Sequence, residues 1–438
     1  MSSQNSGVNM KVAIAGYGQE GESNYHYWSK LGADITIFDE KQETLRPIPD
    51  SVPTQLGPDV FNDLNGYDLV VRTAGLNPNH ITTDGKIWSS TNEFFAQCPA
   101  PIIGVTGTKG KGTTCSLIAE ILKSAGKTVH LLGNIGTPAL NILPSISKDD
   151  IVVFELSSFQ LWDLEKSPET AVVLMIEADH LNVHADMEDY VTAKAQIGAF
   201  QTEKDLLVYH PRNKFSAQIA ALSPAQKRQF MSDEGANVVD GKIQIDGIAI
   251  CSSSEVGLLG AHNLENICAA ITASWKYTQD VAAIKLAVSS FKGLPHRLEF
   301  VREVDGVKFY NDSFSSAAGA TIAAIKSFTQ PTILICGGYD KGIDFDELTT
   351  AIAHAQNIKA VILIGMVRHT LAEQLTEKDF THYTVVDSEN FKDSIELAQD
   401  KAVMGDVVLL SPGTSSFDMF KNFYDRGDQF KQIVGALS

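Results

Sequence analysis

Short apolar runs, rich in Val, Ile and Leu, alternate along the chain with longer amphipathic stretches. The runs cover residues 11–16, 34–39, 68–75, 101–107, 150–158, 171–180, 332–338, 360–365 and 406–413. Strand-length runs separated by helix-length stretches are typical of βαβ units, so the pattern predicts an α/β fold built on parallel sheets. Each run leads into Gly, Ser, Thr, Asn, Asp or His. Ligands of such folds bind beyond the carboxyl ends of the strands, and we expect the functional residues there.

The length of the chain predicts more than one domain. Its 438 residues exceed what one ordinary hydrophobic core supports, so two or three domains are expected. The pattern is interrupted near 95–99 and near 293–298, which predicts domains at 1–97, 98–297 and 298–438. Residues 1–9 are predicted to form a disordered leader.

The net charge, the cysteines and the apolar runs indicate which kinds of partner and which cell compartment are expected. The formal net charge is −18, which argues against a general nucleic-acid surface because such surfaces need clustered Lys and Arg. Anionic nucleotides can still bind locally through backbone N–H groups. The five cysteines show no CxxC spacing, which suggests a reducing compartment. No signal-peptide pattern or membrane-length apolar run occurs in the sequence, so a cytoplasmic protein without a membrane partner is expected.

The strongest chemical signal is GTKGKGTT at 107–114, between a predicted strand and an amphipathic helix. Small residues let backbone N–H groups turn inward around phosphate oxygens, and the helix N-terminus adds positive dipole. Lys111 would supply a charge for the β- and γ-phosphates and Thr113 a hydroxyl for Mg²⁺. The segment departs from the strict GxxxxGK[ST] pattern at Val105 and Gly112. It still predicts an ATP site formed by Gly107, Thr108, Lys109, Gly110, Lys111, Gly112, Thr113 and Thr114.

A second glycine-rich turn lies near the N-terminus. Residues 16–21 fit GxGxxG, and Asp39 ends the next predicted strand, an arrangement that favours dinucleotide binding. Glu20 and Glu22 lie where a pyrophosphate would approach, which weakens an NAD assignment. The turn therefore indicates either some nucleotide diphosphate or only a structural tight turn.

Glu155 and His180 each end a predicted strand. Glu and His at neighbouring strand ends can reach a Mg²⁺ ion held by ATP phosphates, because Mg²⁺ takes few protein ligands and keeps substrate oxygens. His180 alone would be a hydrogen-bonded core or loop histidine, but its pairing with Glu155 favours a metal site. Lys194, on the following predicted helix, is from its residue type and position simply a solvated helix lysine.

Further polar segments follow the later strands. They cover 260–266, 293–299, 311–313, 337–342 and 411–417. Each segment alone could be a helix cap or a turn, since Asn, Asp and Ser are common there for structural reasons. Their joint position after strands indicates a shared cleft.

The order of these motifs resembles the Mur ligases of bacterial cell-wall synthesis. The similarity covers about residues 11–432. It rests on GTKGKGTT, GNIGTPAL (133–140), ELSSFQL (155–161), DH…Y…AK (179–194), GAHNLEN (260–266), GLPHRLE (293–299), NDS (311–313), GGYDKGIDF (337–345) and the block from 410 to 430. ELSSFQL and the last block are most similar to those of the glutamate-adding members.

The resemblance implies three domains: a Rossmann-like N-terminal domain for a UDP moiety, a central P-loop ATPase domain, and a Rossmann-like C-terminal domain that carries the amino-acid site. The last would swing about residues 293–298 to close over ATP. The implied enzyme is an ATP-dependent amide ligase. It would activate UDP-N-acetylmuramoyl-L-alanine as an acyl phosphate and join it to D-glutamate, and it would act as a monomer.

The resemblance also implies individual roles. Catalysis would depend on Lys111, Glu155, His180 and Lys194. Two Mg²⁺ ions would be held by Thr113, Glu155, His180 and Lys194, the last as a carbamate formed with CO₂. Nucleotide contacts would come from Asn266, Arg297 and Asp312. Substrate contacts would come from Gly18, Gln19, Asp39, Thr73, Asn134, Ser157, Gln160, Lys341, Ser416 and Phe423, of which the last three would bind glutamate.

One segment departs from the family pattern. Phe314 stands where the glutamate-adding members usually carry a lysine, and Ser316 stands where they carry a threonine. L-glutamate or another amino acid therefore stays an alternative, as does a folylpolyglutamate-synthase-like ligase. An NAD-dependent oxidoreductase would leave the P-loop and the Glu155/His180 pair unused. A non-enzymatic nucleotide switch would need the metal only for structure.

Overall fold

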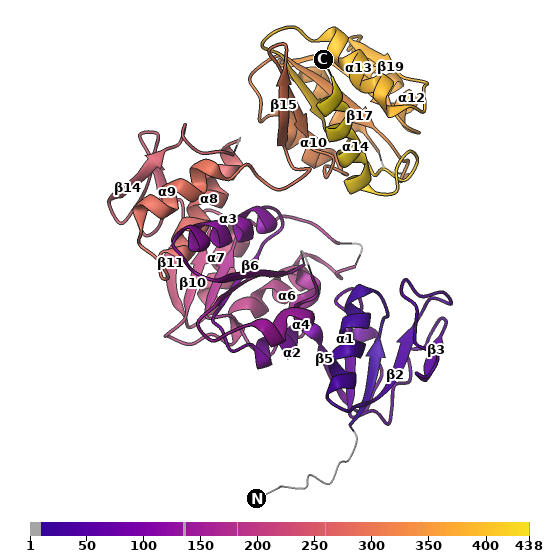
Figure 1. The fold of residues 1–438 in the computed structure, drawn as a ribbon, viewed down its shortest axis with the longest axis vertical. Helices are drawn as coiled ribbons and strands as arrows, with labels where there is room; N and C mark the ends of the chain where they lie inside the picture. Colours follow the sequence, from indigo (N-terminus) through magenta and orange to yellow (C-terminus); the bar gives the residue numbers. More distant parts are fainter. Residues whose placement is uncertain (1–9, 135–136, 182, 259, 343, 438) are drawn as a thin grey trace, which may run out of the picture. The chain divides into compact units, whose positions relative to one another are not determined.

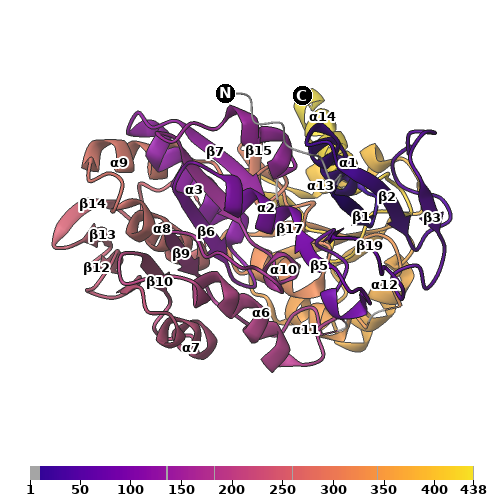
Figure 2. The same ribbon diagram turned by 90° about the horizontal axis from the view of Figure 1, so that it is seen from below.

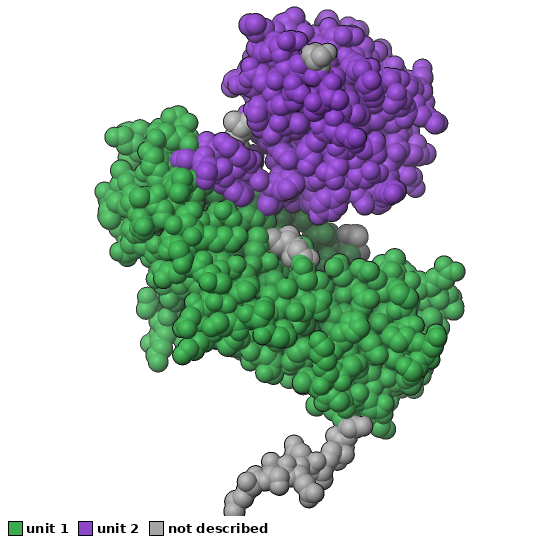
Figure 3. Space-filling view, in the orientation of Figure 1, with its two compact units in different colours: residues 1–255, 265–288 green, residues 256–264, 289–438 purple. Residues whose placement is uncertain are grey.

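The structure is a computed structural model that describes residues 10–134, 137–181, 183–258, 260–342 and 344–437. The leader predicted at 1–9, and parts of two motifs at 135–136 and 343, lie outside the described residues. The chain divides into two compact units (Figure 3). The first contains residues up to 255 together with 265–288, and the second contains 256–264 together with 289 onwards.

The first unit begins with a five-stranded parallel sheet, in the order β3-β2-β1-β4-β5 (Figure 1). Its strands are β1 (Lys11–Ala15), β2 (Asp34–Asp39), β3 (Thr54–Leu56), β4 (Leu69–Arg72) and β5 (Lys86–Ser89). Helix α1 (Gln19–Lys30) follows β1 and buries Trp28 against the sheet. Helix α2 (Ser90–Gln97) leads out of β5.

A six-stranded parallel sheet follows in the same unit, in the order β11-β10-β9-β6-β8-β7 (Figure 2). Its strands are β6 (Ile102–Thr106), β7 (Val129–Gly133), β8 (Ile151–Glu155), β9 (Thr170–Val173), β10 (Leu206–Tyr209) and β11 (Gln226–Gln229). Helices α3 (Lys111–Ser124) and α6 (Met187–Ala199) follow β6 and β9. Strand β6 is buried throughout and lies between β9 and β8, so its carboxyl end is central in the sheet.

Further helices and a small sheet complete this region. The helices are α4 (Ala139–Ile142), α5 (Ser158–Leu161), α7 (Lys214–Leu222), α8 (Ala261–Ser274), α9 (Val281–Ser290) and two 3-10 turns, Pro78–His80 and Leu143–Ser145. A small antiparallel sheet is formed by β12 (Asn237–Val239), β13 (Lys242–Ile245) and β14 (Ile248–Ser252). The apolar pattern did not predict it, because its strands are short and only partly buried.

The second unit contains one six-stranded sheet, in the order β15-β16-β20-β17-β18-β19. Its strands are β15 (Glu299–Val304), β16 (Val307–Asn311), β17 (Thr332–Gly337), β18 (Ile358–Ile364), β19 (Tyr383–Val385) and β20 (Val407–Leu410). Strands β15 and β16 pair antiparallel and the rest are parallel. One face packs on α10 (Ala318–Ile325), α11 (Asp346–His354) and α12 (Arg368–Glu377), and the other on α13 (Phe391–Lys401) and α14 (Phe423–Ala436).

The predicted α/β fold with parallel sheets is confirmed, and every apolar run contains a strand. The run at 171–180 is a strand only as far as Val173, so the prediction was wrong for its second half. The reason is local: Met175 O accepts from Thr108 N, and Glu177 N donates to Thr108 Oγ1, so this backbone pairs with the 107–110 loop. Among the described residues, no helix combines the length and the hydrophobicity that crossing a bilayer requires.

Candidate active site

The loop between β6 and α3 has the backbone that a phosphate-binding turn requires. Gly107 has φ +153° and Gly110 has φ +85°, values that favour glycine. A Cβ atom on Gly110 would overlap Asn266 Oδ1, so Asn266 of α8 lies directly against the loop. Lys111 Nζ donates to the carbonyls of Gly107 (3.1 Å) and Thr108 (2.9 Å). The structure therefore brings the predicted loop and Asn266 together.

The threonines of the loop have separate partners. Thr108 Oγ1 donates to Glu177 O (3.1 Å) and lies 3.2 Å from Tyr190 Oη. Thr114 Oγ1 donates to Asn266 Oδ1 (3.4 Å). Thr113 lies in the first turn of α3 beside Gly112 and is 8% exposed. Lys109 remains at the surface, where its ammonium lies 3.7 Å from the Glu177 carboxylate.

Lys194 is buried, which corrects its interpretation as a solvated helix lysine. Only 1% of the residue is exposed. Its Nζ donates to Gly107 O (2.9 Å) and to Thr106 Oγ1 (3.3 Å), and it lies 4.6 Å from the Tyr190 ring centroid. Burial, together with the ammonium of Lys111, lowers the pKa of Lys194 well below its usual value. The residue type and its place on a predicted helix do not indicate burial, because they do not show which other segments cover that helix.

Glu155 ends β8 with a carboxylate that is buried and only partly satisfied. The residue is 5% exposed; Oε1 accepts from Asn134 Nδ2 (3.2 Å), and Oε2 has no hydrogen-bond partner among the described residues. A buried carboxylate oxygen without a donor is costly unless a cation or proton satisfies it. Glu155 with Asn134 therefore fits a cation held beside the 107–110 loop.

The expected pairing of Glu155 with His180 at neighbouring strand ends was wrong. Strand β6 lies between β8 and β9, and His180 is seven residues beyond the last residue of β9, Val173. The His180 side chain is 47% exposed, its φ is +54°, and its ring lies 5.0 Å from that of Phe159. In the described parts of the chain, no three acidic, His or Cys side chains gather into a metal-binding cluster.

A second histidine in the same segment was missed. His184 is 2% exposed, with Nδ1 2.9 Å from Asp189 Oδ2 and Nε2 2.9 Å from Ser158 Oγ. Its ring stacks on Phe159 at 5.7 Å. His184 therefore ties α5, which follows Glu155, to α6, which carries Lys194. In the sequence, only its position four residues after His180 indicated that His184 belongs to the same site.

The N-terminal glycine turn is held from two sides. Asp39 Oδ2 accepts from Tyr17 N (2.7 Å), and Thr73 N donates to Ala15 O (2.9 Å). Gly18 is the N-cap of α1, and Gln19 is its first residue. A Cβ atom on Gly16 would overlap Thr73 Oγ1, so Gly18, Gln19, Asp39 and Thr73 belong to one small region.

Glu20 does not face an approaching pyrophosphate, contrary to the expectation. Its side chain turns inward, and Oε2 accepts from Ala74 N (2.8 Å). Burial raises the pKa of Glu20. Glu22 pairs with Arg46 at 3.6 Å in a partly exposed contact. The acidic residues therefore do not argue against a diphosphate ligand at this turn.

Ser157 and Gln160 form the capping box of α5. Gln160 N donates to Ser157 Oγ (3.3 Å), and Ser157 N donates to Gln160 Oε1 (3.0 Å). Both side chains thus have a structural role at the carboxyl end of β8. Their predicted contact with substrate stays a prediction.

In the second unit, Asp312 follows β16 and joins three segments. Its Oδ2 accepts from Ser315 Oγ (2.5 Å) and Ser411 Oγ (2.7 Å), and Oδ1 accepts from Leu298 N (3.1 Å). Burial raises the pKa of Asp312 to about 6, although these hydrogen bonds act to lower it. Leu298 belongs to the GLPHRLE motif, so the motifs at 293–299, 311–313 and 411–417 meet here.

The residues expected to bind glutamate lie on neighbouring loops of the same unit. Lys341 Nζ donates to Ser316 O (3.1 Å), and burial lowers the pKa of Lys341. Phe423 packs on Phe314 with ring centroids 4.9 Å apart. Ser416 is buried and follows β20, which pairs with both β16 and β17. The structure thus brings Lys341, Ser416 and Phe423 to one edge of the sheet.

The chain is similar over most of its length to known proteins. Residues 105–274 match the Mur ligase middle domain, and residues 296–413 match the Mur ligase, glutamate ligase domain. The UDP-N-acetylmuramoylalanine--D-glutamate ligase of Clostridium kluyveri is 38% identical over 446 residues, covering 98% of this chain and 97% of the relative. The chain belongs to the Mur ligase family. The protein of the same name from Clostridium tetani is 37% identical over 449 residues, with the same coverage.

Solved structures of Mur ligases share the fold. The structure of a MurF ligase from Thermotoga maritima in complex with ADP matches with a TM-score of 0.61 at 17% identity, covering 98% of this chain and 95% of that one. At this identity the likeness concerns architecture alone. The predicted Mur ligase resemblance and its α/β architecture are confirmed, whereas the residue-level domain boundaries stay a prediction.

Proposed function

We propose that this Mur ligase joins D-glutamate to UDP-N-acetylmuramoyl-L-alanine in an ATP-dependent reaction of peptidoglycan precursor synthesis. One observation carries the proposed chemistry: the side-chain nitrogens of Lys111 and Lys194 both donate to Gly107 O, at 3.1 and 2.9 Å. Two lysines from different helices therefore converge on one loop, and the buried Glu155 carboxylate interacts electrostatically with Lys194. The substrate assignment is supported by the two Clostridium relatives named UDP-N-acetylmuramoylalanine--D-glutamate ligase, which are similar over 98% of this chain.

The first step would be phosphoryl transfer. The substrate carboxylate attacks the γ-phosphorus of ATP, the bond to the β,γ-bridging oxygen breaks, and an acyl phosphate and ADP form. Backbone N–H groups of 107–112 would hold the phosphates, and Lys111 would neutralise charge on the transferring oxygens. Glu155, Thr113 and a carbamate on Lys194 would hold Mg²⁺, which would supply further charge neutralisation. Asn266, against the loop, would contact the nucleotide.

The second step would be acyl transfer. The amine of glutamate attacks the acyl carbon, a tetrahedral intermediate forms, and phosphate leaves to give the amide. Lys341, Ser416 and Phe423 would hold the amino acid, while Arg297 and Asp312 would contact the nucleotide. Acyl phosphates hydrolyse readily, so water must be excluded during this step. We assign the UDP moiety to the turn formed by Gly18, Gln19, Asp39 and Thr73, and the rest of that substrate to Asn134, Ser157 and Gln160.

Lys194 is proposed to carry a carbamate. Its neutral amine would attack CO₂, forming an N–C bond and releasing one proton, so that a cation becomes a carboxylate-like ligand. Burial among Thr106, Gly107 and Tyr190 supports this, because an uncharged amine is favoured at a buried position. The cytoplasmic location and the monomeric state of the protein stay predictions. The five cysteines, all of them among the described residues, form no disulfide, as is typical of proteins in a reducing compartment.

The test is phosphate release from ATP with UDP-N-acetylmuramoyl-L-alanine and one amino acid at a time. We expect release with D-glutamate and none with Lys111→Ala. Release only with L-glutamate or another amine would keep the ligase chemistry and refute the D-glutamate assignment. No release with any amino acid, but release with a folate substrate, would place the chain with the folylpolyglutamate-like ligases.

A further inference from the structure

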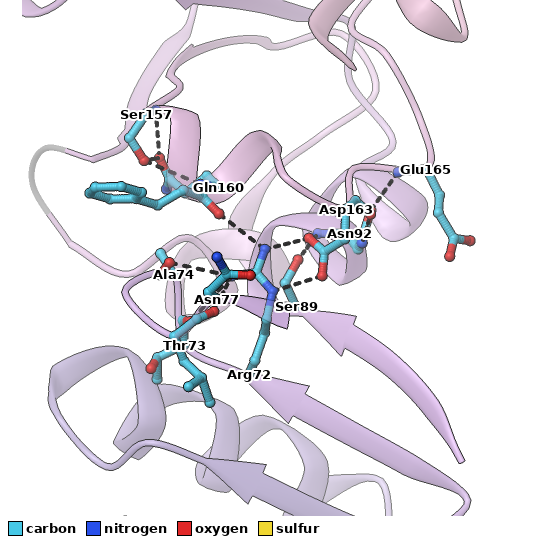
Figure 4. A network of polar contacts seen from close by, with 12 residues as sticks. Arg72, Thr73, Ala74, Asn77, Ser89, Asn92, Ser157, Gln160, Asp163 and Glu165 are labelled. Carbon is cyan, nitrogen blue, oxygen red and sulfur yellow. Dashed lines mark hydrogen bonds and ion pairs between the residues drawn. The ribbon is translucent and has the colours of Figure 1, made fainter. Parts of the chain in front are cut away.

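Arg72 is a fully buried arginine at the carboxyl end of β4, at the junction of the two sheets of the first unit. Its guanidinium forms a two-bond contact with Asp163: Nε donates to Oδ2 (2.7 Å) and Nη2 to Oδ1 (2.5 Å) (Figure 4). Nη2 also donates to Phe159 O of α5 (3.0 Å). Arg72, which belongs to the five-stranded sheet, therefore bonds to Asp163 and Phe159, two residues that follow β8 of the six-stranded sheet.

The same guanidinium holds the loop that carries Thr73. Nη1 donates to three carbonyls of that loop, those of Thr73 (3.3 Å), Ala74 (3.3 Å) and Leu76 (3.2 Å). The amide of the same loop is held by Glu20 of the glycine turn, whose partly buried carboxylate accepts from Ala74 N. The loop is thus fixed through its carbonyls by the Arg72 guanidinium and through its amide by the Glu20 carboxylate.

Asp163 is itself held in place. Asn92 of α2 donates from Nδ2 to Asp163 O (2.7 Å), and Asn92 Oδ1 accepts from Glu165 N (2.8 Å). Figure 4 shows these groups converging with Arg72 on the segment that follows the Ser157–Gln160 capping box. The contact therefore joins a loop assigned to the UDP moiety to the segment assigned to the reacting end of the same substrate.

We propose that Arg72 is a positioning residue for the UDP-linked substrate, which fixes the Thr73 loop relative to α5 so that both ends of one long ligand fit at once. The inference rests on the proposed function. Only the planar guanidinium fork can bond a carboxylate and four carbonyls together; a lysine would keep the charge and lose most of these bonds. The function proposed for Thr73 thus depends on a residue that need not touch substrate.

The experiment compares Arg72→Lys, Arg72→Met and the double variant Arg72→Met/Asp163→Leu with the wild-type chain. The double variant removes both charges of the buried pair and so avoids an unpaired carboxylate. Binding of UDP-N-acetylmuramoyl-L-alanine is measured by calorimetry, KM for each substrate by phosphate release, and folding by thermal unfolding. Asp387→Asn, at an exposed ion pair with Arg368, is the matched control.

We expect Arg72→Lys and the double variant to remain folded, with a lower melting temperature because buried carbonyls lose their donor. Below that temperature they should bind the UDP-linked substrate about tenfold or more weakly, since small misplacements are costly. KM for ATP should stay within about twofold of wild type, because the 107–114 loop is untouched. If the stable double variant binds the UDP-linked substrate as wild type does, Arg72 is only structural and the inference fails. If the wild-type chain itself does not bind it, the proposed function fails first.

Discussion

The guanidinium of Arg297 lies over the ring of Phe314, 3.8 Å from its centroid. Phe314 is one of the two residues that we expect to differ from the glutamate-adding Mur ligases, and Arg297 is one of the residues assigned to the nucleotide. A cation held over an aromatic face gains about 0.5–1 kcal/mol at an exposed site. Phe314 therefore supplies an aromatic surface for Arg297, where a lysine would place a second positive charge beside the guanidinium.

This contact predicts that restoring the usual lysine is harmful in this chain. Phe314→Lys loses the cation–π contact and places an ammonium beside the guanidinium, so KM for ATP should rise about threefold to tenfold. Phe314→Tyr keeps the ring and should behave as wild type. Steady-state kinetics with varied ATP measures both. An unchanged KM in Phe314→Lys would show that the contact does not position Arg297 for ATP.

Gly110→Ala should abolish ATP binding. The residue has φ +85°, and a Cβ atom would overlap Asn266 Oδ1, so either the loop or the Asn266 side chain must move. Gly126→Ala is the matched control, because Gly126 has φ +78° and nothing within 4 Å of the added atom. Both substitutions should cost about 1–2 kcal/mol in stability, but only Gly110→Ala should lose nucleotide affinity, measured with a fluorescent ATP analogue. Equal affinity in the two variants would contradict this.

Asp312 predicts a pH dependence of stability. Its pKa in the folded chain is raised to about 6, so the stability that it contributes is fully present below about pH 4 and is lost as pH rises through 6. The unfolding free energy of wild type, relative to Asp312→Asn, should therefore fall by about 3 kcal/mol between pH 4 and 7. Denaturant unfolding of both chains across this range measures it. A difference independent of pH would show that folding does not raise the pKa of Asp312.

Arg426 of α14 holds the two loops after β16 and β20 that belong to the predicted glutamate site. The fully buried guanidinium donates to Ser313 O (2.9 Å), Ser313 Oγ (3.0 Å), and the carbonyls of Thr414 and Ser415. Arg426→Met should lower the unfolding free energy by about 3 kcal/mol and raise KM for glutamate. Arg368→Met, at a partly exposed arginine, should change stability by less than about 1 kcal/mol. Wild-type KM in Arg426→Met would refute the role in ordering the loops.

The carbamate proposed on Lys194 is detectable without turnover. Incubation with ¹³C-labelled bicarbonate should give one carbamate carbonyl resonance that disappears in Lys194→Arg and persists in Lys214→Arg, a substitution at an exposed helix lysine. A spectrum with no resonance specific to Lys194 would leave the buried amine unmodified. In that case its two hydrogen bonds to Thr106 and Gly107 would be a structural contact.

The apolar runs predicted nine of the described strands, because central parallel strands are buried on both faces and form continuous apolar runs. Strands β3, β5, β7, β10 to β16 and β19 were not predicted. Loop 107–114 was recognised since its glycines and lysine act within one short segment. The burial of Lys194 and of Arg72 could not be predicted in this way, because each depends on segments distant in sequence that cover a charged side chain. His180 was misplaced for a related reason: strand order was assumed from chain order, and β6 lies between the two strands.

The bonds of Arg72 to Asp163 and Phe159 also limit the exchange of the N-terminal sheet between related ligases. The first sheet has its own core, yet Tyr27 Oη donates to Glu93 and Ser23 Oγ to Asn141, so polar contacts of the same kind recur along its border. Residues 11–89 therefore cannot be exchanged without the residues that they contact in the rest of the unit. A chimera that takes them from one relative and the ATPase core from another would function only where both parents supply matching partners for the buried guanidinium.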